Sequence, residues 1–264
     1  MNNLELNKIY CESNLETMAR MPNNFIDLTV TSPPYDDLRD YNGYSFPFED
    51  IAKELYRVTK NGGVIVWIVG DATINGSETG TSFKQALFFK ECGFNLHDTM
   101  IYQKNSFPFP PSNRYFGVFE YMFVLSKGNP KTTNLKRVKT SGEIKKSTGA
   151  RQKDGSIQLH KYETGKDTRI KENVWVYECG YGKTTTDKNA FKHPAMFPEK
   201  LVSDHIYTWS NEDDLVYDCF MGSGTTAKMA HIYKRNWIGS ELSQEYVDLA
   251  NKRLEPYLTQ QTLF

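Results

Sequence analysis

The sequence predicts an α/β protein with a doubly wound, mostly parallel, Rossmann-like sheet. Short β-branched apolar runs alternate with helical runs, which is typical of parallel strands joined by crossover helices. A Gly-x-Gly turn lies between a strand and a helix in the last quarter of the chain. With 264 residues the chain can bury a sizeable core, so one large α/β domain with an insertion accounts for its length.

The first strand of this sheet is expected at Phe25–Val30, after a short helix at Leu15–Met21. It runs into Thr31-Ser32-Pro33-Pro34-Tyr35. Proline has no N–H for a sheet ladder, and Pro33 pushes Ser32 towards extended geometry. The strand end therefore presents a hydroxyl, carbonyl oxygens and an aromatic ring within five residues. That combination is suited to gripping a planar heterocycle by an amino group.

The alternation continues through the first half of the chain. A helix over Phe48–Thr59 has an apolar face, Asn61-Gly62-Gly63 is expected to end it, and a buried strand follows at Val64–Val69. A helix is expected next, at Ser82–Cys92. Two strands follow, one around Met100–Tyr102 and one at Glu120–Leu125.

A polar, basic stretch from Gly128 to about Gly182 interrupts this pattern. Although the chain carries 32 Lys and Arg against 32 Asp and Glu, residues 127–192 carry 16 against 7. Such composition is ordinarily that of a solvated or disordered loop. A loop this long inside a compact domain is usually functional, however, and a basic block suits a polyanion. Because Tyr162, Trp175, Tyr177 and Tyr181 are interleaved, part of it is expected to pack, and we interpret it as an inserted DNA-reading segment.

The last part of the chain resumes the α/β order. We expect helices at residues 198–206, 227–233 and 246–257, and strands at residues 214–220 and 237–239. Between the first of these strands and its helix, Gly222 and Gly224 allow a tight turn and close approach of a ligand to the main chain. Glu241 ends the next strand, where a carboxylate can accept both hydroxyls of a ribose.

This turn has two nucleotide-binding interpretations. Gly222-Ser-Gly-Thr-Thr-Ala227 fits the G-x-G-x-x-A pattern of nicotinamide dehydrogenases, but a single match of that kind is weak. Only 23 residues follow Glu241, too few for the rest of a dinucleotide domain. The N-terminal half is therefore expected to complete the sheet.

Two motifs carry a family resemblance. Thr31-Ser32-Pro33-Pro34-Tyr35 resembles the catalytic motif of amino-methylating DNA methyltransferases, in the form typical of N4-cytosine enzymes. Asp218 to Thr225 resembles their S-adenosylmethionine motif, and His193-Pro194 through Leu201 resembles the helix that precedes it. The order of catalytic motif, insert and cofactor motif is similar to the circularly permuted beta class. The resemblance covers residues 6–128 and 190–257 and leaves the insert unmatched.

The resemblance implies three regions and a set of site residues. The regions are a catalytic half at 1–128, a target-recognition region at 129–190 and a cofactor-binding half at 191–264. A basic target-recognition region implies double-stranded DNA as partner. The implied catalytic residues are Ser32, Pro33, Pro34 and Tyr35. The implied contacts to S-adenosylmethionine are Thr31, His193, Pro194, Asp218, Phe220, Gly222, Ser223, Gly224, Thr225 and Glu241.

The implied chemistry is methylation of a cytosine amine. Ser32 and the Pro33 carbonyl would accept the hydrogens of the amine, Tyr35 would stack on the flipped base, and Phe220 would stack on the cofactor adenine. For Phe220, a core phenylalanine at a strand end is the alternative. No covalent intermediate is needed, and none of the four cysteines follows a proline. One departure is Ser13, which stands where the family commonly has an Asp, so no contact is assigned there.

Two alternatives stay open at this stage. The same scaffold could act on the N6 amine of adenine, or the chain could be a non-enzymatic nucleic-acid-binding module, although both motifs are intact. The four cysteines have no CxxC pairing, which indicates neither a metal site nor disulfides. Without a signal segment or a long apolar run, we expect a cytoplasmic prokaryotic or phage-type protein and no membrane. It would be a monomer or homodimer, with a possible cognate restriction endonuclease.

Overall fold

The structure is a computed structural model that describes most of the chain. The described residues are 4–34, 46–105, 113–139, 148–160, 167–180, 182–185, 187 and 198–259, without the side chains of 148–150 and 159–160. The chain divides into two units. The larger comprises Met1–Asn134 and Asn173–Phe264, and the smaller comprises Leu135–Glu172.

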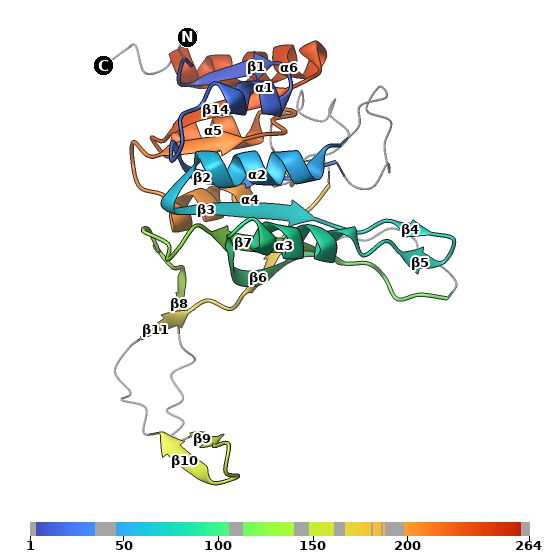
Figure 1. Ribbon diagram of the computed structural model, residues 1–264, viewed down its shortest axis with the longest axis vertical. Helices are drawn as coiled ribbons and strands as arrows, with labels where there is room; N and C mark the ends of the chain where they lie inside the picture. The colour runs from blue at the N-terminus through green and yellow to red at the C-terminus, as the bar shows by residue number, and fades with distance from the viewer. Residues whose placement is uncertain are drawn as a thin grey trace. The chain divides into compact units, whose positions relative to one another are not determined.

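An eight-stranded sheet forms the centre of the larger unit (Figure 1). In spatial order the strands are β1 (Lys8–Cys11), β14 (Asn236–Glu241), β13 (Leu215–Asp218), β2 (Ile26–Thr31), β3 (Thr59–Val69), β7 (Phe119–Ser126), β6 (Asn95–Lys104) and β12 (Val174–Tyr177). Strand β7 runs antiparallel to both of its neighbours, β3 and β6, and every other neighbouring pair in this sheet is parallel.

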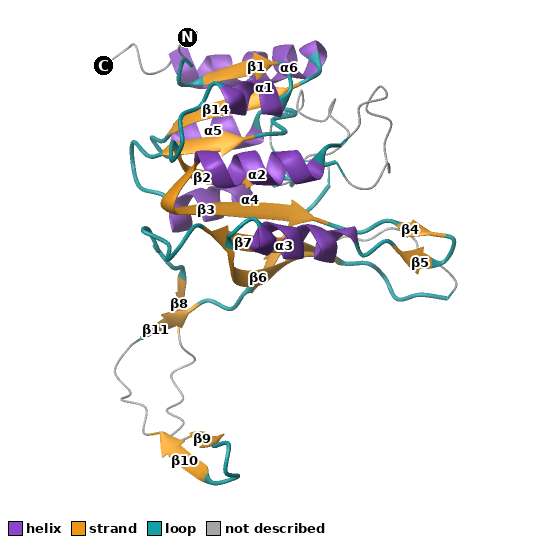
Figure 2. Ribbon diagram, in the orientation of Figure 1, coloured by secondary structure: helices purple, strands orange, loops and turns teal. Residues whose placement is uncertain are grey.

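Helices cover both faces of this sheet (Figure 2). One apolar core joins the sheet to α1 (Asn14–Ala19), α2 (Phe48–Val58) and α3 (Thr81–Glu91). The other joins it to α4 (Glu199–Trp209), α5 (Thr225–Ile232) and α6 (Gln244–Thr259). The doubly wound, mostly parallel α/β fold predicted from the sequence is confirmed. None of the helices in the described ranges is long and apolar enough to cross a membrane.

The boundary between α2 and β3 differs from the prediction. The helix ends at Val58, and Asn61-Gly62-Gly63 lies within β3 rather than ending the helix. Thr59 already pairs with Ile26 of β2, and its hydroxyl donates to the Leu55 carbonyl at 2.6 Å. The expectation that the glycines end this helix is therefore wrong, because strand pairing ends it first.

Two asparagines anchor the larger unit where the chain leaves it and returns to it. The Asn134 backbone N–H donates to the Thr208 carbonyl at 2.8 Å, and its side chain donates to the Tyr207 carbonyl at 3.1 Å. At the return, the Asn173 side chain donates to the Thr99 carbonyl at 3.1 Å. Both connections to the smaller unit therefore begin from backbone that is held in place.

The smaller unit consists of short antiparallel ribbons. Strand β8 (Arg137–Lys139) pairs with β11 (Thr168–Ile170), and β9 (Thr148–Arg151) pairs with β10 (Ile157–His160). This unit lies within the predicted target-recognition region, whereas residues 129–134 and 173–190 belong to the larger unit. A further two-stranded hairpin, β4 (Thr73–Ile74) with β5 (Ser77–Glu78), follows β3 in the larger unit.

Candidate cofactor and catalytic site

The candidate site lies where three parallel strands end side by side. Strands β2, β13 and β14 are consecutive in the sheet and end at Thr31, Asp218 and Glu241. Because their carboxyl ends meet at one edge, the two motifs from opposite ends of the chain come together there. This edge of an open α/β sheet is where ligands generally bind.

The Asp218 carboxylate joins β13 to β2. It accepts hydrogen bonds from the Thr31 and Thr226 hydroxyls, both at 2.6 Å, and from the Phe220 backbone N–H at 3.0 Å. Burial raises the pKa of Asp218 to about 6, against the opposing effect of the hydrogen bonds from Thr226, Thr31 and Phe220. The carboxylate therefore fixes the position of Thr31 relative to the glycine turn.

The turn after β13 needs glycine at two positions. Gly222 and Gly224 have φ values of 50° and 79°, in the left-handed region that favours glycine. A Cβ on Gly224 would also lie 2.9 Å from the Ala250 Cβ of α6. The turn is closed by a hydrogen bond of 2.9 Å from the Gly224 N–H to the Met221 carbonyl.

Glu241 is oriented by two backbone groups. One carboxylate oxygen accepts the Gly222 N–H at 2.8 Å, and the other accepts the Ser243 N–H at 3.0 Å. Burial raises the pKa of Glu241, and these backbone hydrogen bonds oppose that effect. Each carboxylate oxygen can accept a further hydrogen bond, since it has two lone pairs. A fixed acceptor beside a glycine turn fits the ribose of a nucleoside cofactor such as S-adenosylmethionine.

Phe220 lies half-buried at the start of this turn, next to other aromatic side chains. Its ring centroid lies 5.7 Å from that of Phe46 and 6.3 Å from that of Trp67, both in edge-on geometry. Because the ring keeps some exposure, stacking on an adenine and packing in the core are both compatible with its position.

The predicted catalytic segment, residues 32–35, is described as far as Pro34. Thr31 and Pro33 are buried, whereas Ser32 and Pro34 are half-buried. Ser223 and Thr225 are buried in the glycine turn and the first turn of α5. Tyr35, His193 and Pro194 lie outside the described residues. The structure thus brings Thr31, Asp218, the glycine turn and Glu241 to one edge of the sheet, with Ser32 following Thr31 directly.

Comparison with known proteins identifies the family. Residues 26–252 match the N6_N4_Mtase family, described as DNA methylase. M.BamHII of Bacillus amyloliquefaciens, named an orphan methyltransferase, is 59% identical over 238 residues, which cover 88% of this chain and 90% of that protein. The type II methyltransferase M.ScaI of Streptomyces caespitosus is 26% identical, covering 94% and 81%. The chain belongs to the N6/N4 DNA methylase family.

Solved structures agree with this fold. The PvuII DNA methyltransferase, named cytosine-N4-specific, is similar with a TM-score of 0.69 and 23% identity, covering 96% of this chain and 90% of that one. TTHA0409 from Thermus thermophilus, solved with S-adenosyl-L-methionine, gives a TM-score of 0.64 at 21% identity, with coverage of 95% and 93%. The predicted cofactor, S-adenosylmethionine, is the methyl donor of this DNA methylase family.

The start of α1 also reaches the site of this methylase. Ser13, at the position where an Asp was expected, is the N-cap of α1 and forms a capping box with Glu16. The next residue, Asn14, is buried and donates from its side chain to the Cys219 carbonyl at 3.1 Å. The sequence analysis missed Asn14, because nothing in its local pattern distinguishes it from other helix-start residues.

A buried charge cluster behind the glycine turn of the methylase was also missed. Arg253 of α6 donates to the Ser223 carbonyl at 3.0 Å and lies beside Glu199 and Lys228. A signal did exist in the sequence. Arg253 follows the buried Ala250 by three positions and precedes the buried Leu254, so it falls on the apolar face of its helix.

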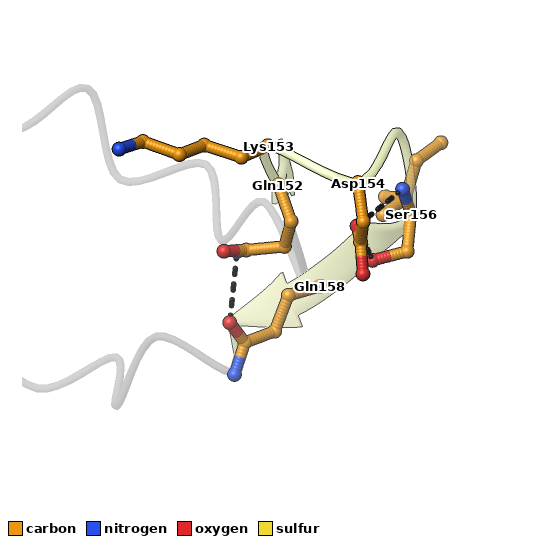
Figure 3. Close-up of a pocket in the computed structure, with 6 residues that line it drawn as sticks. Gln152, Lys153, Asp154, Ser156 and Gln158 are labelled. Atoms are coloured by element: carbon orange, nitrogen blue, oxygen red, sulfur yellow. Dashed lines mark hydrogen bonds between the residues drawn. The ribbon is translucent and has the colours of Figure 1, made fainter.

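In the smaller unit, a shallow pocket lies on the β9–β10 hairpin (Figure 3). The Gln152 side chain donates to that of Gln158 at 2.8 Å, and Asp154 accepts from the Ser156 hydroxyl and N–H. The lining residues are Gln152, Lys153, Asp154, Ser156, Ile157 and Gln158. This pocket is far too open to enclose a nucleoside cofactor, and its polar side chains are instead available at the surface.

Proposed function

We propose that this DNA methylase transfers a methyl group from S-adenosylmethionine to the N4 amine of a cytosine flipped out of double-stranded DNA. The observation that carries the proposal is the 2.6 Å hydrogen bond between the Thr31 hydroxyl and Asp218. It couples the segment that would hold the base to the turn that would hold the cofactor. Methyl transfer needs those two ligands at a fixed separation, and positioning of this kind is a large part of catalysis.

The cofactor-binding part rests on Glu241 and the glycine turn. Glu241 would accept the two ribose hydroxyls, and Phe220 would stack on the adenine. The backbone of the turn, from Gly222 to Thr225, would lie against the cofactor, with Asp218 and Thr31 fixing its geometry. His193 and Pro194 are proposed to contribute from the segment before α4. When bound, S-adenosylmethionine supplies an activated methyl group.

The catalytic part rests on residues 32–35. The exocyclic amine of cytosine is a poor nucleophile because its lone pair is delocalised into the ring. The Ser32 oxygen and the Pro33 carbonyl would accept its hydrogens and so localise the lone pair, while Pro34 keeps the turn stiff. Tyr35 would stack on the base. Because the amine is buried in a duplex, the base has to be flipped out first.

The order of the motifs supports an assignment to the beta class. The proposed catalytic residues 32–35 precede the insert, and the proposed cofactor residues 218–241 follow it. The sheet joins them because β2 and β13 are neighbours. The circularly permuted arrangement is thus compatible with a single continuous site.

For DNA recognition we propose the region 129–190. A two-stranded β-ribbon has the width to enter the major groove, and the β9–β10 hairpin has that architecture. Lysine and glutamine are side chains that read guanine and adenine edges there. Lys153, Gln152 and Gln158 are exposed on this hairpin. The net positive charge of the region would add phosphate contacts.

The choice of base is tested by mass analysis of nucleosides. The alternative, N6-adenine methylation, uses the same scaffold and family. The serine in Ser32-Pro33-Pro34 favours N4, and a cytosine-N4-specific enzyme is among the proteins of similar fold. DNA treated with the protein and S-adenosylmethionine, then digested, should contain N4-methylcytosine and no C5-methylcytosine. N6-methyladenine as the product would replace the cytosine assignment.

A role in restriction–modification is suggested by the relatives. M.ScaI is named a type II methyltransferase, whereas M.BamHII is named an orphan methyltransferase. We propose that the protein marks a specific site against cleavage by an endonuclease of matching specificity. Protection of methylated DNA from endonucleases of known sites would reveal that sequence.

A further inference from the structure

Arg253 is a charged side chain in the interior of the larger unit. The residue is 3% exposed and lies on the face of α6 that packs on the sheet core. Removing a guanidinium from water costs several kcal/mol unless it is paired and hydrogen-bonded. Its buried position therefore requires hydrogen-bonding and charged partners, and these partners indicate the role of Arg253.

The first set of partners belongs to the glycine turn. One terminal nitrogen of Arg253 donates to the Ser223 carbonyl and to the Thr225 hydroxyl, both at 3.0 Å, and lies 3.3 Å from the Ser223 hydroxyl. The neighbouring Gly222 N–H is the group that orients Glu241. The guanidinium thus holds the turn at Ser223 and Thr225, whereas the Glu241 carboxylate contacts it at Gly222.

The second set of partners flanks the segment that contains His193 and Pro194. The other terminal nitrogen of Arg253 pairs with Glu199, the first residue of α4, and its Nε lies 3.2 Å from the Asp187 carboxylate. Lys228 also pairs with Glu199, at 2.8 Å. Burial would raise the pKa of Glu199, but hydrogen bonds from Lys228 and Thr185 and the charge of Arg253 hold it below its usual value. Two cations and two carboxylates therefore balance within the cluster.

We propose that Arg253 is a positioning residue for the cofactor site, an inference that rests on the proposed function. It touches neither the cofactor nor the base. It fixes the Ser223 carbonyl and the Thr225 hydroxyl, so that the turn keeps Gly222 against Glu241 before the cofactor arrives. A planar guanidinium presents donors in a fixed fork, so Arg253 can hydrogen-bond a carbonyl, a hydroxyl and the Glu199 carboxylate at once while it pairs by charge with Asp187.

The test compares two buried arginines in the full-length protein. Arg253→Met keeps volume but removes the donors. The matched control is Arg235→Met, because Arg235 is also buried and donates to the Ser210 carbonyl and hydroxyl, away from the glycine turn. For each variant we would measure the Kd for S-adenosylmethionine by calorimetry, the melting temperature, and kcat and KM.

Arg253→Met should weaken cofactor binding by at least about tenfold, since charge-assisted hydrogen bonds are lost from a preorganised site. KM for S-adenosylmethionine should rise, with kcat at saturating cofactor within about threefold of wild type. Arg235→Met should lower the melting temperature while changing the Kd less than about threefold. If Arg253→Met does not fold, Arg253→Lys replaces it in the test. A lysine ammonium keeps the charge but cannot hold both sets of partners, so cofactor binding should again be weaker.

A second variant separates positioning from stability. Arg253→Met leaves one cation, Lys228, against two carboxylates, and adding Glu199→Gln restores equal charge between Lys228 and Asp187, so the melting temperature should recover while the Kd stays weak. Recovery of the Kd along with the melting temperature would overturn the inference. Wild-type protein that does not bind S-adenosylmethionine would instead overturn the proposed function, so the two failures are distinguishable.

Discussion

The Thr31 hydroxyl donates to the Asp218 carboxylate at 2.6 Å, although the two residues are 187 positions apart in the chain. Both are buried, and the contact spans neighbouring strands β2 and β13. Hydrogen bonds stabilise the charge of this buried carboxylate, and among the described residues no cation lies at hydrogen-bonding distance from it. Its protonation should therefore be visible in the stability of the protein.

We expect Asp218 to make the wild-type protein less stable as pH rises from about 4 to about 6. Its pKa is raised to about 6 in the folded state, from an ordinary value of 3.8, so in this window the folded state binds more protons than the unfolded state. Asp218→Asn replaces this titratable carboxyl group with an amide, so the variant lacks its contribution to the pH dependence. The wild-type free energy of unfolding minus that of the variant should fall by up to about 3 kcal/mol, at about 1.4 kcal/mol per pKa unit. Urea unfolding at several pH values measures it, and a constant difference would contradict the prediction.

Glu241→Ala should weaken binding of S-adenosylmethionine in the absence of DNA. Hydrogen bonds to a charged group contribute about 1.5–3 kcal/mol, which corresponds to roughly a 10- to 150-fold change in Kd. Glu245→Ala is the matched control, since Glu245 lies exposed on the first turn of α6. Calorimetry should show wild-type affinity for the control alone. The same affinity in Glu241→Ala would remove the ribose assignment.

Substitutions in the proposed catalytic segment, residues 32–35, should affect turnover more than cofactor binding. Ser32→Ala loses one acceptor but keeps the Pro33 carbonyl, so kcat should fall without vanishing. The fall should stay below the roughly 10²–10³-fold typical of a lost oxyanion donor, because the amine carries less charge. Tyr35→Ala should cost more, about 1–3 kcal/mol of stacking, and Tyr35→Phe less. Single-turnover kinetics measures these effects, and full activity in Tyr35→Ala would reduce the segment to an ordinary turn.

Binding to duplex DNA should depend steeply on salt concentration, because the proposed recognition region, residues 129–190, carries the excess positive charge. Replacing Arg151 and Lys153 of the β9–β10 hairpin with Gln should flatten the plot of log K against log salt by up to about 1.8, at about 0.9 per phosphate contact. Lys90 and Lys234 serve as controls, because they are exposed and precede β6 and β14 in the larger unit, outside the recognition region. An unchanged slope for the hairpin variant would mean that these side chains are only solvated surface.

Elements with a strong local pattern could be predicted from the sequence. The alternation of strands and helices indicated the doubly wound sheet, and the glycine turn with Glu241 was placed at the correct strand ends. The edge strands were not predicted, for different reasons. In β1 only Ile9 is buried, so four residues carry no periodicity. In β12 the alternation is real, with Trp175 and Tyr177 buried, but it lies next to a polar stretch that hides it.

The support of the site could not be predicted, because it depends on contacts between distant residues. Arg253 and Glu199 are 54 positions apart, and Asn14 and Cys219 are 205 positions apart. No local pattern encodes such pairs, since packing of α6 against α5 and of α1 against the sheet edge decides them. A charged residue on an apolar helix face is the only trace that Arg253 leaves in the sequence.

The two anchoring asparagines have a consequence for how the proposed DNA specificity can change. Asn134 and Asn173 hold the chain to α4 and β6, and everything between them forms a separate unit. The entropy of closing a loop grows only slowly with its length, so replacing residues 135–172 with a segment of different length costs the sheet little. With the proposed role of this unit in DNA recognition, the segment for one DNA sequence could be exchanged for another, during evolution or in engineered chimaeras, while the larger unit stays unchanged.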